Sequence, residues 1–280
     1  MLSNLDNEVV FKKAFTDKIV FQCFVKDILG IDVQVGKIET EKRFYPKIGN
    51  IDFELDIYAE TVDKRLCIEL QKVQYDYTHD RFLHYFMMLI AGQQQSAKEY
   101  AIGQTVHQIL VMTLPYTLKD LAGRLLTDEM LITTFTTRNA AKVERLLYRH
   151  SFVTLNPNHR DPSTPKAVKD WLDLIYESMH NPNNPSINLQ NTGIQRAAEL
   201  IEVTKFTPKQ LAAKKNIEQA RNAKIAGEAF AIWQDRVRMA KELHAAQVPL
   251  EVIARTVQYS ADETQQMILL TADHYRKPFF

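Results

Sequence analysis

The chain has 280 residues, of which 45% are hydrophobic and 25% are charged. These fractions lie close to the averages of globular domains and exclude a disordered chain and a simple coiled coil. With 35 basic and 34 acidic residues the net charge is +1, so the overall charge indicates no class of partner. The two cysteines are too few for a disulfide framework, which favours reduced thiols in the cytoplasm.

No segment of the sequence is predicted to enter a membrane. The first residues are polar and acidic and lack the apolar core of a signal peptide. The longest apolar run, from Tyr85 to Ala91, is much shorter than the ~20 residues of a spanning helix. We therefore expect a soluble cytoplasmic protein without membrane contact.

The first 160 residues are predicted to mix helices and strands. Apolar residues at three- and four-residue spacing predict one helix from Glu8 to Leu29, which ends at Gly30. The remaining predicted elements are strands over 33–39, 51–58, 65–71, 108–113 and 131–137 and an aromatic-rich helix over 78–96.

The residues after about 160 are predicted to be entirely helical. Six of the ten prolines lie between Pro157 and Pro208, and turn-forming residues from Asn156 to Pro162 break the preceding pattern. We therefore expect an α/β domain at 1–160 and a helical region at 161–280. The predicted helices cover 166–179, 193–204, 207–246 and, as two short helices, 248–269.

Positive charge gathers in the segment 205–241, which carries nine basic and three acidic residues, a net charge of +6. Helices with excess lysine are often simply solvated, whereas the same charge also suits the DNA backbone, and both interpretations stay open. The two short helices of 248–269 loosely resemble a helix-turn-helix; we favour packing of a helical tail there over reading of DNA.

Acidic residues stand out in the two clearest strands. In 51–58, strand periodicity places the acids, which include Asp56, on the face opposite the apolar residues. In 65–71 it places Glu69 and Gln71 on the outer face. If the two strands pair as a hairpin, Asp56 and Glu69 face the same way.

Two carboxylates held close together repel each other unless a cation lies between them. Such a pair suits a hard divalent ion with oxygen ligands, Mg²⁺ or Mn²⁺. A plain solvated face is the alternative, because outer faces of half-exposed strands are often acidic, and Asp52 and Glu54 fit that interpretation. Glu69 and Gln71 fit it less well, because Glu and Gln are poor strand formers.

The order of these residues resembles a known family, the Rpn recombination-promoting nucleases and transposases of the PD-(D/E)xK superfamily. The likeness covers roughly residues 5–160, with a weaker match over 236–270. The segments that carry it are, in chain order, Glu8-x-x-Phe11-Lys12, Asp56, Glu69-Leu-Gln71 and Arg81-x-x-x-Tyr85.

The resemblance implies a PD-(D/E)xK core and a metal-dependent DNA endonuclease that hydrolyses phosphodiester bonds, with a link to recombination or transposition. It implies that Asp56 and Glu69 hold Mg²⁺ or Mn²⁺, that Gln71 positions the attacking water, and that Glu8 assists. Gln71 stands where the superfamily carries a lysine. Lys72 or Lys42 could supply the missing positive charge.

Two rival functions stay open at this point. The first is a catalytically weak DNA-binding or assembly protein that keeps the nuclease fold. The second is a protein-interaction module, and its only support is the long predicted helix. The expected partner is DNA, and a homo-oligomer is compatible with the sequence.

Overall fold

The computed structural model describes residues 1–45, 51–72, 78–94, 101–115 and 118–270. The chain divides into two compact units, Met1–Lys214 and Lys215–Phe280, and each is described by itself.

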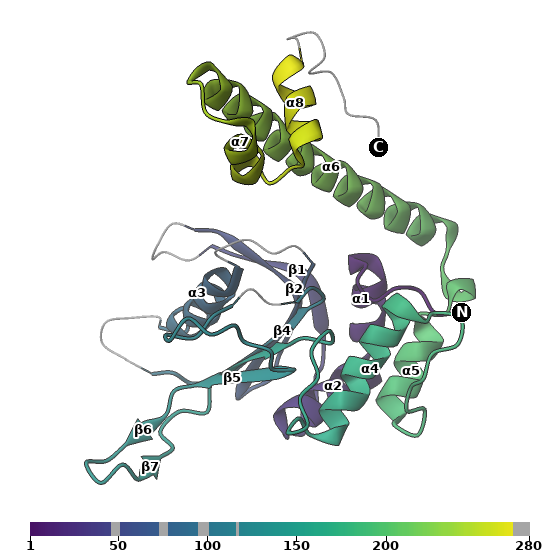
Figure 1. Ribbon diagram of the computed structural model, residues 1–280. Helices are drawn as coiled ribbons and strands as arrows, with labels where there is room; N and C mark the ends of the chain where they lie inside the picture. The colour runs from purple at the N-terminus through teal and green to yellow at the C-terminus, as the bar shows by residue number, and fades with distance from the viewer. Residues whose placement is uncertain (46–50, 73–77, 95–100, 116–117, 271–280) are drawn as a thin grey trace. The chain divides into compact units, whose positions relative to one another are not determined.

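A six-stranded mixed sheet lies at the centre of the first unit (Figure 1). Its strand order is β1-β2-β3-β4-β8-β5. The first three strands pair antiparallel, β3, β4 and β8 run parallel, and β5 returns antiparallel to β8. A small separate hairpin is formed by β6 and β7. The strand bounds are β1 (Ile38–Phe44), β2 (Phe53–Glu60), β3 (Lys64–Gln71), β4 (Thr105–Met112), β5 (Met130–Thr134), β6 (Thr137–Arg138), β7 (Glu144–Arg145) and β8 (Ser151–Leu155).

Helices cover both faces of the sheet (Figure 1). One apolar core joins the sheet to α1 (Glu8–Phe15), α2 (Lys18–Leu29), α4 (Lys166–His180) and α5 (Thr192–Leu200). The second core lies between the opposite face and α3 (Thr78–Ala91). A mixed sheet flanked by helices confirms the expected α/β fold class and agrees with the PD-(D/E)xK core that the resemblance implies.

The first two helices that follow residue 160, α4 and α5, belong to this first unit. Trp171 of α4 is fully buried, and its ring meets those of Phe15 and Phe24 at centroid distances of 6.0 and 5.1 Å. The indole Nε1 donates a hydrogen bond to Asp27 of α2 over 2.8 Å. The boundary expected near residue 160 therefore falls inside the unit, because α4 and α5 pack against the N-terminal helices.

The single helix expected over 8–29 is two helices. Asp17 caps the second one, since its carboxylate accepts hydrogen bonds from the backbone N–H groups of Ile19 and Val20. An aspartate in this position favours a new helix start over continuation. The expected end is confirmed, because Gly30 adopts a left-handed backbone with φ of 69°.

The first strand lies later in the chain than expected. Val33 and Val35 are buried, but the structure assigns no strand to residues 31–37, and β1 begins at Ile38. Alternating burial in an extended loop therefore imitated a strand. The aromatic-rich helix ends at Ala91, and the last residues expected in it lie outside the described part of the chain.

The side-chain alternation of β2 changes at one position. Leu55 packs in the core that contains α3, whereas Ile57 packs in the opposite core. The expectation that the apolar residues of 51–58 share one face is therefore wrong. The pairing register places Glu41 of β1 opposite Asp56 at this position, and Glu41 has φ of 54°, in the left-handed region. Such a backbone is unfavourable for a residue other than glycine and marks a local irregularity.

The second unit contains most of the long helix α6 (Pro208–Ala245), followed by α7 (Leu250–Val257) and α8 (Ala261–Leu269). These bounds confirm the long helix and the two short ones. Ser260 and Glu263 form a capping box at the start of α8. A small core holds Ala240, Ile253 and Val257. None of the described helices combines the length and apolar character needed to cross a membrane.

Gly193 lies where α5 packs on α4 and α2, so a substitution there tests this packing. A Cβ there would collide with Cβ of Cys23 and lie 2.9 Å from Cζ2 of Trp171. We expect Gly193→Ala to lower the free energy of unfolding by about 1–3 kcal/mol, although alanine normally favours a helix. Urea denaturation followed by circular dichroism measures this. Gly227→Ala in α6, with nothing within 4 Å, is the matched control and should be neutral or stabilising. Equal effects of the two changes would contradict the packing.

Candidate active site

Asp56 and Glu69 come from neighbouring strands, at the point where their pairing ends. The hydrogen-bonded register of β2 and β3 reaches Ile57 opposite Ile68. One step further, the carboxylate of Asp56 accepts a hydrogen bond from the backbone N–H of Leu70, with Oδ2 2.9 Å from the nitrogen. The side chain of Asp56 thus takes the place of a strand partner, which brings its carboxylate beside Glu69.

Glu69 is withdrawn from solvent, and Asp56 is partly so, with its side chain 24% exposed. Glu69 is only 3% exposed, and its Oε1 has no hydrogen-bond partner among the described residues. Burial, together with the nearby charge of Asp56, raises the pKa of Glu69 well above its usual range. Burial also raises the pKa of Asp56, although the hydrogen bond from Leu70 opposes the shift. Glu69 was expected on an outer face, but α3 covers that side of the sheet.

Lys12 of α1 places an ammonium group among the acids. Its Nζ lies 2.5 Å from Glu8, 3.0 Å from Glu41 and 3.9 Å from Asp56. Burial lowers the pKa of Lys12, but the hydrogen bonds to Glu8 and Glu41 outweigh this and the pKa is raised. A lysine with this pKa keeps its charge at neutral pH, so three carboxylates share one fixed cation.

Glu8 reaches the acids through this lysine. It is the first residue of α1, and Lys12 lies one helical turn later, at the spacing where side chains meet. The charge of Glu8 contributes to the raised pKa of Asp56. Glu8 therefore lies at the edge of the site and contacts the lysine.

Glu41 is a site residue that the sequence did not identify. It faces the site because the left-handed backbone interrupts β1 opposite Asp56. Glu41 combines a strained backbone with an ion pair to the partly buried Lys12, and this combination indicates a functional site more strongly than the strain alone. Glu41 belongs to no sequence motif, so only the structure identifies it.

Gln71 contacts an arginine from the opposite helix layer. Arg81 of α3 donates a hydrogen bond from Nη2 to Oε1 of Gln71 over 2.8 Å. The guanidinium of Arg81 lies 6.0 Å from the ring centre of Tyr85. Burial raises the pKa of Tyr85, Arg81 opposes the shift, and the charges of Glu69 and Asp56 add to it. Arg81 and Tyr85 thus approach the acids from the α3 side.

Two lysines were considered as substitutes for the superfamily lysine. Lys42 makes its contacts elsewhere, and Lys72 stays a candidate. Lys42 pairs with Glu39, with Nζ 3.2 Å from Oε1, and faces the ring of Tyr58. Lys72 follows β3 directly and is half-buried. The cation that the structure brings to Asp56 is Lys12. Its signal in the sequence was the four-residue spacing from Glu8.

The donor set suits a hard cation only in part. Within the described ranges, no three His, Cys, Asp or Glu side chains gather as a metal-binding group. Asp56 and Glu69 do offer two carboxylates, one with an oxygen that no described group satisfies. Oxygen donors of this kind match Mg²⁺ or Mn²⁺, which commonly use one or two carboxylates and complete their shell with water and substrate. Glu54, by contrast, is exposed and pairs with Arg43, as a solvated face predicts.

A sequence model of the PD-(D/E)XK nuclease family transposases matches residues 5–227. Because this match covers most of the 280 residues, the chain belongs to that family. The suspected relationship is thereby confirmed, and it supports a function related to nucleases or transposases. No curated protein and no solved structure matches the sequence significantly.

The burial of Glu69 predicts a pH-dependent stability. Because its pKa is raised in the folded state, the folded chain holds the proton more tightly than the unfolded chain. Stability therefore falls as the pH rises from the ordinary carboxyl range through the raised value. We expect Glu69→Gln to raise the melting temperature at pH 8 in EDTA, by about 2–4 °C for each kcal/mol of relief.

The measurement is thermal unfolding of both proteins between pH 5 and pH 9. The gain should shrink towards pH 5, where the wild-type carboxyl is protonated. Glu54→Gln, at an exposed position on β2, is the control and should show no such gain. A melting temperature of Glu69→Gln below that of the wild type at pH 8 would contradict the shift.

Proposed function

We propose that the protein hydrolyses DNA phosphodiester bonds with a divalent cation held by Asp56 and Glu69. The observation that carries this proposal is the buried carboxyl oxygen of Glu69, which has no hydrogen-bond partner among the described residues and lies beside the partly buried carboxyl group of Asp56. Two such groups are costly to ionise together without a cation. Membership in a nuclease family supports DNA as the substrate class.

The metal, when bound, would lower the pKa of a coordinated water and offset charge on the phosphate. The chain's own residues supply the remaining functions. Gln71 orients a water by hydrogen bonding, and Arg81 fixes the Gln71 amide by binding its Oε1. The N–H groups of a glutamine amide can donate to a water or a phosphate oxygen.

Lys12 supplies the positive charge that Gln71 does not carry. In this proposal Lys12 takes over the electrostatic role of the superfamily lysine from another element of the fold. Its ammonium already lies 3.9 Å from Asp56, and Glu8 and Glu41 hold it there. A fixed cation near the scissile phosphate stabilises the charge that develops during hydrolysis. Arg81 provides a second cation on the opposite side.

The C-terminal helices are better suited to a supporting role than to the recognition of a DNA sequence. The first turn of α8 exposes Asp262 and Glu263, whose charge repels DNA phosphates. The residues that face inward from α7 and α8 pack against α6 instead. We propose that any contribution of this region to DNA affinity comes from the basic stretch 205–241, without base contacts.

The competing function is a DNA-binding or assembly protein that keeps the fold without turnover. Incubation of supercoiled plasmid with and without Mg²⁺ separates the two. Metal binding without nicking favours the competitor. Metal-dependent nicking supports the proposal.

Asp56→Asn and Glu69→Gln should each reduce Mg²⁺-dependent nicking by at least about 100-fold, because each removes a metal ligand. Both changes keep the side-chain shape, and asparagine can still accept from Leu70. Asp52→Asn, an exposed acid just before β2, is the matched control and should retain activity. Full activity of either site variant, with unchanged circular dichroism, would refute the assignment.

Lys12→Gln should lower the nicking rate by about 10- to 100-fold, and Gln71→Lys should restore at least part of it in the double variant. The reason is that lysine at position 71 returns a cation to the superfamily position. Single-turnover rates of the four forms give the coupling. Lys42→Gln serves as the control and should leave the rate unchanged. If the folded double variant shows no rescue, Lys12 does not take over the role of the superfamily lysine.

A further inference from the structure

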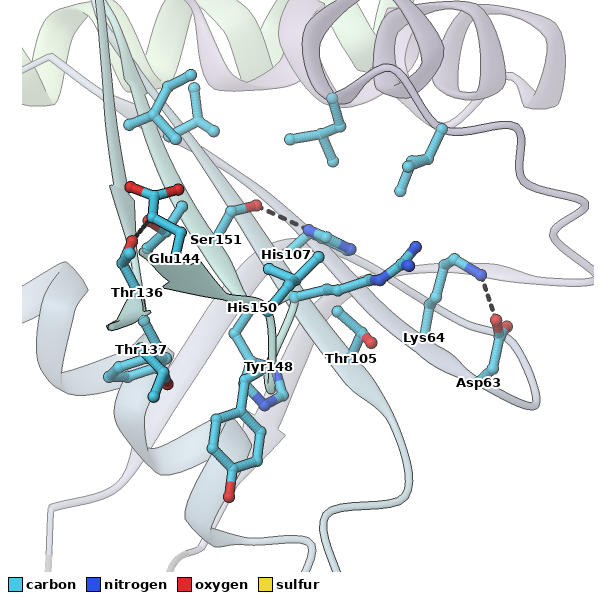
Figure 2. A pocket seen from close by; sticks show the side chains of 18 of the residues that line it. Asp63, Lys64, Thr105, His107, Thr136, Thr137, Glu144, Tyr148, His150 and Ser151 are labelled. Atoms are coloured by element: carbon cyan, nitrogen blue, oxygen red, sulfur yellow. Dashed lines mark hydrogen bonds and ion pairs between the residues drawn. The ribbon is translucent and has the colours of Figure 1, made fainter. Parts of the chain in front are cut away.

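A cavity of about 490 Å³ lies at the other end of the sheet from the proposed active site. It opens beside the first residues of β3, β4 and β8, where Lys64 pairs in register with Thr105 (Figure 2). Glu69 lies five residues further along β3, a separation of roughly 16 Å for a strand. The cavity is therefore separate from the acids.

His150 is the most informative residue of its lining. Its Nδ1 accepts a hydrogen bond from the backbone N–H of Val106 over 2.9 Å, so the ring proton belongs on Nε2. The side chain is 4% exposed, and Nε2 has no partner among the described residues. Burial lowers the pKa of His150, which keeps the ring neutral. A buried N–H donor without an acceptor is unfavourable by about 1–3 kcal/mol, which an acceptor in the cavity would recover.

The remaining polar lining holds more basic than acidic side chains, and its carboxylate Glu144 is paired with Arg138. His107 shares a 2.7 Å hydrogen bond with Ser151, and burial lowers its pKa to about 4, so it offers hydrogen bonds and no charge (Figure 2). Lys64 is paired with Asp63. Arg145 and Arg149 also line the cavity and expose their side chains, which places positive charge at its mouth.

Aromatic side chains form one wall. The ring of Tyr148 lies nearly parallel to that of His150, with centroids 5.9 Å apart, and Phe135 meets His150 edge-on at 6.1 Å. A second cavity of about 560 Å³ shares these three residues with the first. Ile28 and Ile132 add aliphatic surface. Cavities of this size accept small organic molecules, and an aromatic wall favours a planar ring.

We propose that this cavity binds a small organic anion that contains both a planar aromatic ring and a phosphate or carboxylate group. The anionic oxygen accepts from Nε2 of His150 and lies near Arg149, and the ring packs against Tyr148 and Phe135. Because Nε2 is closed to solvent, a neighbouring side chain must move to admit the ligand, and Tyr148, which stacks on the His150 ring and is about half exposed, is placed to do so. The site does not depend on the proposed nuclease activity.

Isothermal titration calorimetry in EDTA with four probes tests this: deoxyadenosine monophosphate, indole-3-carboxylate, deoxyadenosine and inorganic phosphate. At least one ring-bearing anion should bind about tenfold more tightly than either fragment. Which anion binds identifies the group as phosphate or carboxylate. The proposal is overturned if neither anion binds at millimolar concentration, or if phosphate or deoxyadenosine binds as tightly as the anion.

Variants locate the binding. Arg149→Gln at the exposed mouth should weaken binding about two- to fivefold, and His150→Phe by at least about tenfold. Arg124→Gln, an exposed arginine that does not line the cavity, is the matched control. Glu69→Gln should bind the probe like the wild type. Binding that is lost in Glu69→Gln but kept in the folded Arg149→Gln would place the ligand at the acids and overturn the proposal.

Discussion

The proposed active site depends on the electrostatic cost of placing the buried carboxyl group of Glu69 beside the partly buried one of Asp56. Asp56 and Glu69 lie where β2 and β3 stop pairing. Because burial restricts the access of water to both groups, their charges cannot be solvated freely. Three neighbouring groups reduce that cost. Leu70 donates a backbone hydrogen bond, Lys12 contributes an ammonium group, and Arg81 approaches from the other layer. The arrangement is suited to a cation because it is unfavourable without one.

The sequence predicted the parts of the fold that follow from local pattern. The hairpin of β2 and β3, the strand β4 and the short C-terminal helices all carry clear periodicity or turn residues. The positions of Asp56 and Glu69 on neighbouring strands followed from the same periodicity, even though the predicted faces were partly wrong. Burial on both sides of the sheet was not predictable, because alternation alone does not reveal a helix layer such as α3.

The features that escaped prediction arise from long-range packing. The approach of Lys12 to Asp56 joins a helix to a strand that lies more than forty residues later. Val33 and Val35 imitated a strand because buried loop residues and strand residues can alternate alike. Proline and asparagine near residue 160 marked a loop, and only the packing of Trp171 showed that the chain returns to the same unit.

The left-handed backbone of Glu41 has a consequence for sequence variation among relatives of this fold. Residues that tolerate this conformation are few, with glycine and asparagine foremost. A relative that keeps the same strand irregularity is expected to carry one of these or an acid there. Glycine or asparagine at this position would preserve the path of β1 while leaving its counterpart of Lys12 with one carboxylate fewer. The identity of this residue would therefore distinguish relatives that retain only the shape of the site from those that also retain its charge balance.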